Sequence, residues 1–197
     1  MTMQKQKIDK IFKLTNRELW IVTAGTPQQR GGLLATWVLQ ASLDRASPVL
    51  VAGIAPNHFT RELIDDTGAF ATHLLRQSQV DLALKFALQS GRNVDKLAGL
   101  RVSETETGNP VLQDVLCWLD CRVFARLDTG NRIFYWADVI AGEQQENSPP
   151  LTEQELLNHT DDDIRARLIL DRESDIEQQK SQYNEWRENL PPLLRPI

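Results

Sequence analysis

Apolar and β-branched residues gather in short runs along the first two thirds of the chain, and such runs favour extended, half-buried backbone. Glycine, proline, asparagine and aspartate separate the runs and predict the turns between them. Residues 128–131, Asp-Thr-Gly-Asn, lie between two such runs and predict the turn of an antiparallel hairpin. The predicted strands cover residues 19–24, 33–43, 49–55, 69–75, 121–127 and 133–140. The whole segment 111–127 fits a helix or a strand, although its second half, residues 121–127, alternates like a strand.

The predicted strand at residues 33–43 alternates between an apolar face and a mostly polar face. Gly31 and Gly32 precede it, and glycine permits another group to approach the backbone closely. The apolar face holds Ala35, Trp37, Leu39, Ala41 and Leu43, and the other face holds Thr36, Val38, Gln40 and Ser42.

Two short helices are predicted among the strands. The first covers residues 61–65, with Thr60 or Asn57 as its N-cap. The second follows Ser78 as N-cap and carries apolar residues at helical spacing as far as Leu88. Strands therefore outnumber helices in this part of the chain. A closed or nearly closed antiparallel barrel is the natural way to complete such a sheet.

A boundary falls at residues 148–150, Ser-Pro-Pro, because the pattern beyond it becomes helical and acidic. We therefore predict a domain at residues 1–147 and a helical extension at residues 148–197. Thr160 is expected to cap a long helix that begins at Asp161. The predicted buried stripe of this helix consists of Ile164, Leu168, Ile169, Ile176 and Tyr183.

The composition excludes global disorder, since 41% of the 197 residues are hydrophobic and 25% are charged. The net charge is -5, and residues 143–197 hold 13 acidic and 6 basic residues, so the acidic excess lies in the extension. Without a basic stripe, nucleic acid is not expected as a partner. No apolar run approaches the roughly 18 residues of a membrane span, so no membrane partner is expected either.

The cysteines and histidines narrow the chemistry further. Two cysteines do not make a disulfide scaffold, and the N-terminus lacks the apolar core of a signal peptide, so we expect a cytoplasmic protein. Cys117 and Cys121 are then interpreted as buried thiols. His58, His73 and His159 lie far apart without metal-ligand spacing, so no metal site is predicted.

Two features point to ligand binding. Thr36, Gln40 and Ser42 form a polar strand face against which an aromatic heterocycle could lie, unless that face simply meets solvent. Residues 57–61, Asn-His-Phe-Thr-Arg, bring free amides, a hydroxyl and a guanidinium to a helix start. That combination is typical of a phosphate site and also of ordinary helix capping. The residues alone leave both alternatives open in each case.

In chain order these features resemble the flavin reductase-like family, which has the FMN-binding split barrel. The correspondence begins at residues 20–23, Trp-Ile-Val-Thr, and includes the segment 34–43. It continues through residues 58–64 and 70–75 to the late strand pair, and it covers roughly residues 15–142.

This resemblance implies a mainly β fold with flanking helices, namely a six-stranded antiparallel Greek-key split barrel, followed by the C-terminal helical extension. It also implies a homodimer with FMN, or FAD as an alternative, near the subunit interface, and NADH or NADPH as co-substrate. By position in the family, the residues that would border the flavin ring and ribityl chain are Ala35, Thr36, Trp37, Gln40, Ala41 and Ser42. The residues that would hold the phosphate are His58, Thr60 and Arg61.

The chain departs from the family pattern at the nicotinamide side. The family often has Gly-Asp-His at the late hairpin, whereas this chain has Gly130-Asn131-Arg132. No catalytic residue is therefore assigned, and Arg132 is the candidate near the nicotinamide or a cofactor phosphate. His73 stands where the family has an asparagine.

Three functions follow as hypotheses. The leading one is an oxidoreductase that transfers reducing equivalents from NAD(P)H to flavin. The alternative is a flavin-binding electron carrier or sensor without efficient NAD(P)H turnover. The third is a relative that binds no flavin and whose interface serves protein partners.

Overall fold

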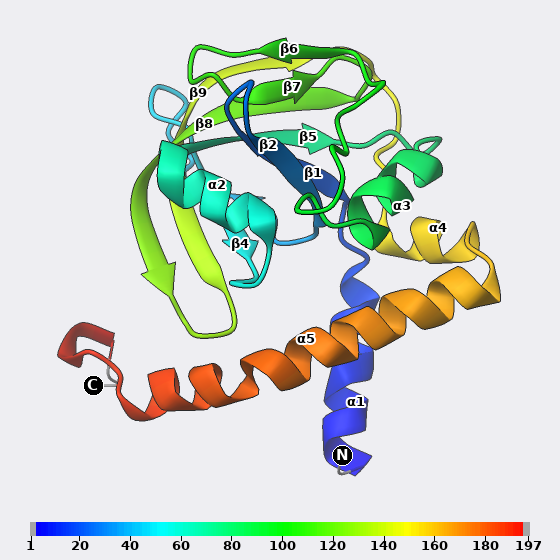
Figure 1. The fold of residues 1–197 in the computed structure, drawn as a ribbon. Helices are drawn as coiled ribbons and strands as arrows, with labels where there is room; N and C mark the ends of the chain where they lie inside the picture. The colour runs from blue at the N-terminus through cyan, green and yellow to red at the C-terminus, as the bar shows by residue number, and fades with distance from the viewer. Residues whose placement is uncertain (1–2, 195–197) are drawn as a thin grey trace.

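A curled antiparallel sheet forms the body of the protein (Figure 1). The computed structural model describes residues 3–194. Seven strands pair in the order β2-β1-β5-β8-β9-β4-β3, and each neighbouring pair is antiparallel. These strands are β1 Trp20–Gly25, β2 Arg30–Ala35, β3 Val38–Gln40, β4 Val49–Ile54, β5 Ala69–Leu74, β8 Cys117–Asp128 and β9 Ile133–Gln144.

Helices and a small hairpin surround this sheet. The short strands β6 and β7 pair with each other in a separate two-stranded sheet. The helix alternative for residues 111–127 is wrong, because β7 ends at Leu112 and β8 begins at Cys117. The remaining elements are α1 Met3–Phe12, η1 Lys13–Thr15, α2 Phe59–Thr67, α3 Val80–Leu88, β6 Val102–Glu104, β7 Pro110–Leu112, α4 Glu153–Asn158, α5 Asp162–Glu188 and η2 Pro192–Leu194.

The sheet curls into a barrel because its two edge strands are consecutive in the chain. β2 and β3 lie at opposite ends of the strand order, yet only Thr36 and Trp37 separate them. One bent segment therefore forms both edges of the curled sheet, so β2 and β3 together occupy one of six strand positions around the barrel. The predicted mainly β barrel with flanking helices and a C-terminal helix is confirmed.

The single strand predicted at residues 33–43 is wrong. Its two halves pair with different strands, β2 with β1 and β3 with β4, and the bend between them interrupts the alternation. Val38 is buried, whereas Leu39 is 55% exposed and Leu43 is 94% exposed. The predicted apolar face therefore does not form, because the chain leaves the sheet soon after the bend.

Two apolar clusters hold the fold together. The first fills the barrel and includes the fully buried Phe70 and Tyr135. The second packs α3 and α4 against the barrel and includes Leu19, Phe86 and Leu151. Burying each such side chain stabilises the folded state by roughly 1.5–3 kcal/mol, so the barrel and these two helices form the stable part of the protein.

The two cysteines are free thiols. Cys121 is buried, as predicted, and Cys117 is half-buried. Burial raises the pKa of both thiols, so both are protonated and unreactive at neutral pH.

The predicted N-caps of the first two helices are wrong. α2 is capped by His58, because Thr60 already lies inside the helix and Asn57 precedes the cap. α3 is capped by Gln79 rather than by Ser78. In neither helix does the capping side chain accept a hydrogen bond from the helix backbone.

The long helix α5 also differs from its prediction. Asp161, and not Thr160, is its N-cap, because the Asp161 carboxylate accepts a hydrogen bond from a backbone N–H of the first turn. The predicted buried stripe does not form, since Ile169 is 55% exposed and Ile176 is 48% exposed, and the other three residues are half-buried. Gln179 is the buried residue of this helix.

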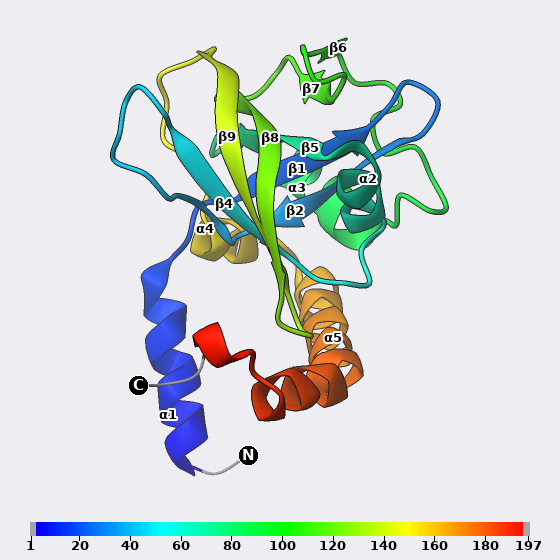
Figure 2. The ribbon, with the colours of Figure 1, turned by 90° about the vertical axis from the view of Figure 1, so that its left-hand side faces the viewer.

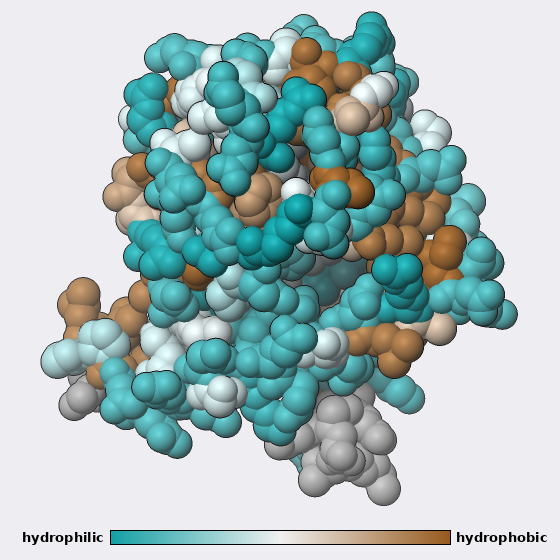
Figure 3. Space-filling model, in the orientation of Figure 1, coloured by the Kyte–Doolittle hydropathy of each residue, from teal (hydrophilic) through white to brown (hydrophobic). Residues whose placement is uncertain are grey.

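α5 crosses below the barrel and passes the end of the β8–β9 hairpin (Figure 2). It therefore touches the barrel over a short stretch instead of packing along it. Figure 3 shows hydrophobic side chains at the C-terminal end of the extension, where Leu193 is 93% exposed. Within residues 3–194, none of the helices is both long and apolar enough to cross a membrane.

Candidate functional site

A cavity of about 100 Å³ lies at the bend between β2 and β3. The end of β4, the turn into α2 and the turn of the β8–β9 hairpin complete its walls. Ligand pockets usually measure about 300–1,000 Å³, so the cavity within one chain is small. The residues that line it are Leu33, Leu34, Ala35, Thr36, Trp37, Gly53, Ile54, Ala55, His58 and Arg132.

The ring of Trp37 forms one side of this cavity and packs against a second ring behind it. Trp37 stacks on Phe134, with ring centroids 6.0 Å apart and planes 11° apart. Gly53 lies against both rings, and its backbone N–H donates to the Trp37 carbonyl at 2.8 Å. A Cβ at Gly53 would lie 3.0 Å from each ring, so glycine allows the rings to close over β4.

Arg132 lies on this aromatic side. Its guanidinium carbon is 5.0 Å from the centroid of the Trp37 ring, which is a cation–π geometry. Its Nη1 donates to the Asn131 carbonyl at 2.5 Å and to Oε1 of Gln179 at 2.6 Å. Burial lowers the pKa of Arg132, and the nearby carboxylate of Asp175 opposes this, so the side chain stays charged.

His58 faces the same cavity from the turn into α2. Burial lowers the pKa of its imidazole, and the carboxylate of Asp175 opposes this shift. His58 is therefore neutral at pH 7. The positive charge of the cavity comes from Arg132 and not from this histidine.

Half of the predicted site residues meet at this cavity. Ala35, Thr36 and Trp37 line it from the bend, His58 lines it from α2, and Arg132 lines it from the hairpin. Sequence reasoning missed Gly53, although a glycine inside a strand is itself a signal of close approach by another group.

The other five predicted residues lie outside the cavity lining. Gln40 and Ala41 are exposed, and Nε2 of Gln40 donates to the Ser42 carbonyl at 2.6 Å. Thr60 is buried within α2. The guanidinium of Arg61 forms ion pairs with two carboxylates of its own helix, so its charge is already compensated.

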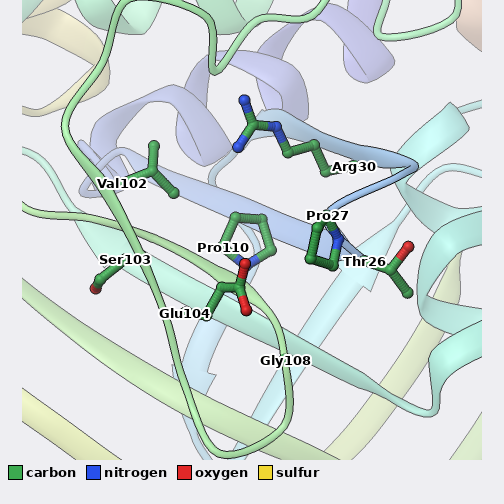
Figure 4. A pocket seen from close by; sticks show the side chains of 8 residues that line it. All are labelled: Thr26, Pro27, Arg30, Val102, Ser103, Glu104, Gly108 and Pro110. Atoms are coloured by element: carbon green, nitrogen blue, oxygen red, sulfur yellow. The ribbon is translucent and has the colours of Figure 1, made fainter.

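A second cavity, of about 170 Å³, lies at the opposite end of β2 (Figure 4). It contains none of the predicted site residues, and its cation, Arg30, is paired with Asp95 at 2.9 Å. The residues that line it are Thr26, Pro27, Arg30, Val102, Ser103, Glu104, Gly108 and Pro110. The cavity at the β2–β3 bend is therefore the better candidate.

The histidines occupy three separate places. His73 is buried in the barrel, where Nδ1 donates to the Ile21 carbonyl at 3.0 Å and Nε2 accepts from the Leu112 N–H at 3.1 Å. Burial lowers the pKa of His73 to about 4, so the ring is neutral and structural. His159 is exposed. Within residues 3–194, no group of three or more histidine, cysteine, aspartate or glutamate side chains could hold a metal ion.

A family model described as a flavin reductase like domain matches residues 12–163, which include the whole barrel and both cavities. The chain belongs to the flavin reductase-like family. The matched segment ends two residues into α5, so most of that helix lies outside it.

One curated relative and two solved structures are similar to this chain. A protein of Nostoc sp. that is named as a diflavin flavoprotein is 31% identical over 126 residues, which are 64% of this chain and 22% of that protein. An FMN-binding protein of Thermus thermophilus, solved with p-hydroxybenzaldehyde, has a TM-score of 0.61 and 22% identity over 66% of this chain and 72% of that one. An NADH:FAD oxidoreductase of Streptomyces globisporus has a TM-score of 0.67 and 17% identity over 76% of this chain and 89% of that one. The two structures show a shared fold, and this chain spans about a fifth of the curated relative.

Proposed function

We propose that this chain binds a flavin nucleotide at the β2–β3 bend and acts as an NAD(P)H:flavin oxidoreductase. One observation carries the proposal: the segment that resembles the family's flavin strand forms a cavity together with Arg132. Within residues 3–194, Arg132 forms no ion pair, although it is half-buried. A partly desolvated cation without an ion-pair partner favours an anionic ligand.

The residues present fit a flavin nucleotide. The bend offers backbone groups and the Thr36 hydroxyl, Trp37 offers an apolar surface, and Arg132 offers a positive charge. A bound flavin would supply the hydride-accepting ring. The chain then only has to bind and orient that ring and exclude water, which requires no catalytic acid or base. FMN is the proposed cofactor, with FAD as the alternative.

The five predicted residues outside the cavity remain part of the proposal. Gln40, Ala41 and Ser42 continue the chain beyond the bend, and Thr60 and Arg61 follow His58 in α2. They contribute if the complete site is larger than 100 Å³. Thr60→Val or Ser42→Ala should then weaken FMN binding by about 1–2 kcal/mol. Unchanged FMN affinity in both variants would remove these residues from the site.

A homodimer would enlarge the site, and we propose that the protein forms one. Leu39 and Leu43 are exposed in the segment that follows the bend, and Phe124 on β8 is 57% exposed. Exposed apolar residues of this kind mark association surfaces when they gather on one face. Light scattering should return about twice the chain mass of 22.4 kDa at micromolar concentration. A mass of one chain would contradict the dimer.

Arg132 favours one alternative function. Histidine, which the family often has at this position, can exchange a proton near neutral pH, whereas arginine stays charged. The fixed charge of Arg132 favours binding of the flavin and stabilises an anionic reduced flavin. It does not supply the proton that a histidine at this position could exchange. A flavin-binding electron carrier or sensor with slow NAD(P)H turnover is therefore the second candidate.

The cytoplasmic location and the division into residues 1–147 and 148–197 stay predictions.

The first residues after the predicted boundary pack against the barrel: Leu151 is fully buried, and its backbone bonds to Leu19 and Leu75. The part of the extension that stands apart is therefore α5.

The visible spectrum tests the proposed function. Purified protein should retain FMN through a desalting column, and anaerobic NADH or NADPH should bleach the flavin band. Arg132→Gln should weaken FMN retention, while Arg122→Gln, which changes an exposed arginine of β8, should not. Retention without bleaching would favour the carrier or sensor. Failure of the wild-type protein to bind FMN or FAD would refute the proposal.

A further inference from the structure

α5 lies mostly outside the family match, yet its buried residue reaches the candidate site. The Gln179 side chain is 4% exposed. Its Oε1 accepts from Arg132 Nη1 at 2.6 Å, and its Nε2 donates to Oδ1 of Asn57 at 3.4 Å. Gln179 therefore bonds to both the hairpin turn and the turn into α2, which border the cavity from two sides.

A second residue of α5 strengthens this attachment. Asp175 lies one helical turn before Gln179 on the same face of the helix. Its carboxylate accepts from Nδ2 of Asn57 at 2.8 Å. The two side chains together tie α5 to the turn that presents His58 to the cavity.

The backbone of the hairpin also packs directly on α5. Gly130 has a φ of +80°, and a Cβ there would overlap the backbone of Gln182 and Tyr183. Only glycine permits this approach, because it lacks the Cβ and adopts positive φ without strain. Figure 2 shows the hairpin end meeting α5.

The charge of Arg132 survives this attachment. Gln179 is neutral, so it fixes the guanidinium above Trp37 without compensating its charge. Asp175, the nearby acid, accepts a hydrogen bond from Asn57 and acts on Arg132 through its charge without forming an ion pair with it. The attachment thus orients a cation at the cavity and leaves that cation available to a ligand.

We propose that α5 is part of the ligand site, and that Gln179 positions Arg132 to bind a phosphate monoester of a nucleotide. This inference rests on the proposed function. FMN and NADPH both carry such a phosphate group, and riboflavin and NADH lack it. Gln179 is a positioning residue, since it acts on the ligand through Arg132.

Three variants of the full chain test the inference. Gln179→Leu removes the hydrogen bond to Arg132. Gln179→Glu keeps a hydrogen-bond acceptor but compensates the charge of Arg132 with a carboxylate. Gln178→Leu is the matched control, because Gln178 is exposed and its side chain donates to Ser174 of its own helix. Circular dichroism checks that all three variants retain the α5 helix.

Two measurements separate the role of the contact from the role of the charge. Hydrogen exchange of residues 128–132, without ligand, reports on the hairpin turn. It should become faster in Gln179→Leu and stay slow in Gln179→Glu. Affinity for FMN or for NADPH should fall about 10-fold in both Gln179 variants, the scale of one lost charge-assisted interaction. Affinities for riboflavin and NADH should stay unchanged. Arg132 binds the phosphate of whichever ligand, FMN or NADPH, loses affinity in the variants.

Other outcomes overturn the inference. Unchanged hydrogen exchange in Gln179→Leu would show that Gln179 does not hold the hairpin. Equal losses for FMN and riboflavin, and for NADPH and NADH, would show that no phosphate is involved. Tighter FMN binding in Gln179→Leu would show that α5 obstructs the site. If wild type binds none of the four ligands, the proposed function fails, whereas normal FMN binding by wild type and by both Gln179 variants refutes only the role of α5.

Discussion

The barrel and α5 are held in place by opposite means. The barrel buries large apolar side chains such as Phe70 and Tyr135 completely. α5 has 27 residues, and its buried residue is a glutamine that makes polar contacts. The candidate site lies where these two regions meet. A stable framework therefore positions the aromatic side of the cavity, and a weakly attached helix positions its cation.

The attachment of α5 is weak because its side-chain contacts are polar, and those outside the Gln179 contact are exposed. Arg172 meets Asp9 of α1 at 3.5 Å, and Arg167 meets the Leu88 carbonyl at 3.4 Å. Exposed ion pairs contribute about 0–1 kcal/mol each. Segments with few buried contacts open more easily than the core, so we expect α5 to detach before the barrel unfolds.

The largest expected effect contrasts one side chain from each region. Phe70→Ala should destabilise the protein by about 3–5 kcal/mol, because it leaves a cavity in the barrel. Ile169→Ala on α5 should change the stability by less than about 0.5 kcal/mol, because the side chain is 55% exposed. Urea unfolding measures both changes. A large loss in Ile169→Ala would show that a second chain covers α5.

The next effect concerns pH and the barrel alone. The unfolded chain protonates a histidine near pH 6.5, whereas His73 in the barrel stays neutral until its pKa of about 4. The stabilisation from His73 is therefore complete above pH 6.5 and falls as the pH is lowered toward 4. Between pH 7.5 and pH 5 the loss should be about 2 kcal/mol.

Paired variants isolate this contribution from that of the carboxylates. His73→Asn should reduce the change in unfolding free energy between pH 7.5 and pH 5 by about 2 kcal/mol. His159→Gln, at an exposed histidine, should retain it. Equal pH dependence in wild type and His73→Asn would contradict a neutral, buried His73.

A smaller effect tests the junction between the two regions. Gly130→Ala and Gly108→Ala both place alanine at a φ near +80°, which costs about 1–2 kcal/mol through backbone strain. A Cβ at Gly108 has open space around it, whereas a Cβ at Gly130 overlaps α5. Gly130→Ala alone should therefore accelerate hydrogen exchange in residues 175–185. Equal exchange in both variants would show that α5 does not pack on the hairpin.

The smallest effect concerns turnover at the same junction. Arg132→His should raise NADH oxidation several-fold, which corresponds to about 1 kcal/mol in the barrier, if the fixed charge limits proton exchange. Steady-state assays at saturating flavin measure this change. Fast turnover in wild type with no change in Arg132→His would remove the functional meaning of the substitution.

Local patterns in the sequence predicted most of the barrel. Apolar runs bounded by glycine and proline located β1, β4, β5 and the β8–β9 hairpin, because each is decided by alternation and turn chemistry within a few residues. The same reasoning failed at residues 33–43. Alternation alone does not reveal that one segment changes pairing partner at Thr36 and Trp37, since the sheet closes through contacts distant in sequence.

The candidate site divides in the same way. Its chemistry was readable in the chain: Thr36 and Trp37 after two glycines, His58 at a helix start, and Arg132 at a hairpin turn. Their convergence on one cavity was not, because it depends on how β2, β4 and the hairpin meet. Gln179 gave no signal at all, since a glutamine in a polar helix is ordinary until the fold places it against Arg132.

The sequence by itself thus determined most of the barrel strands, the hairpin turn, the excess of acid in the extension and the resemblance to the family. Neighbouring residues along the chain set these properties through backbone preference, hydrophobic period and charge. Only the tertiary structure decided which edges close the barrel, which residue of α5 is buried and that the cation at the cavity has no ion-pair partner among residues 3–194. Burial and hydrogen bonding depend on groups far apart in the chain, and their energies exist only once the fold has brought those groups together.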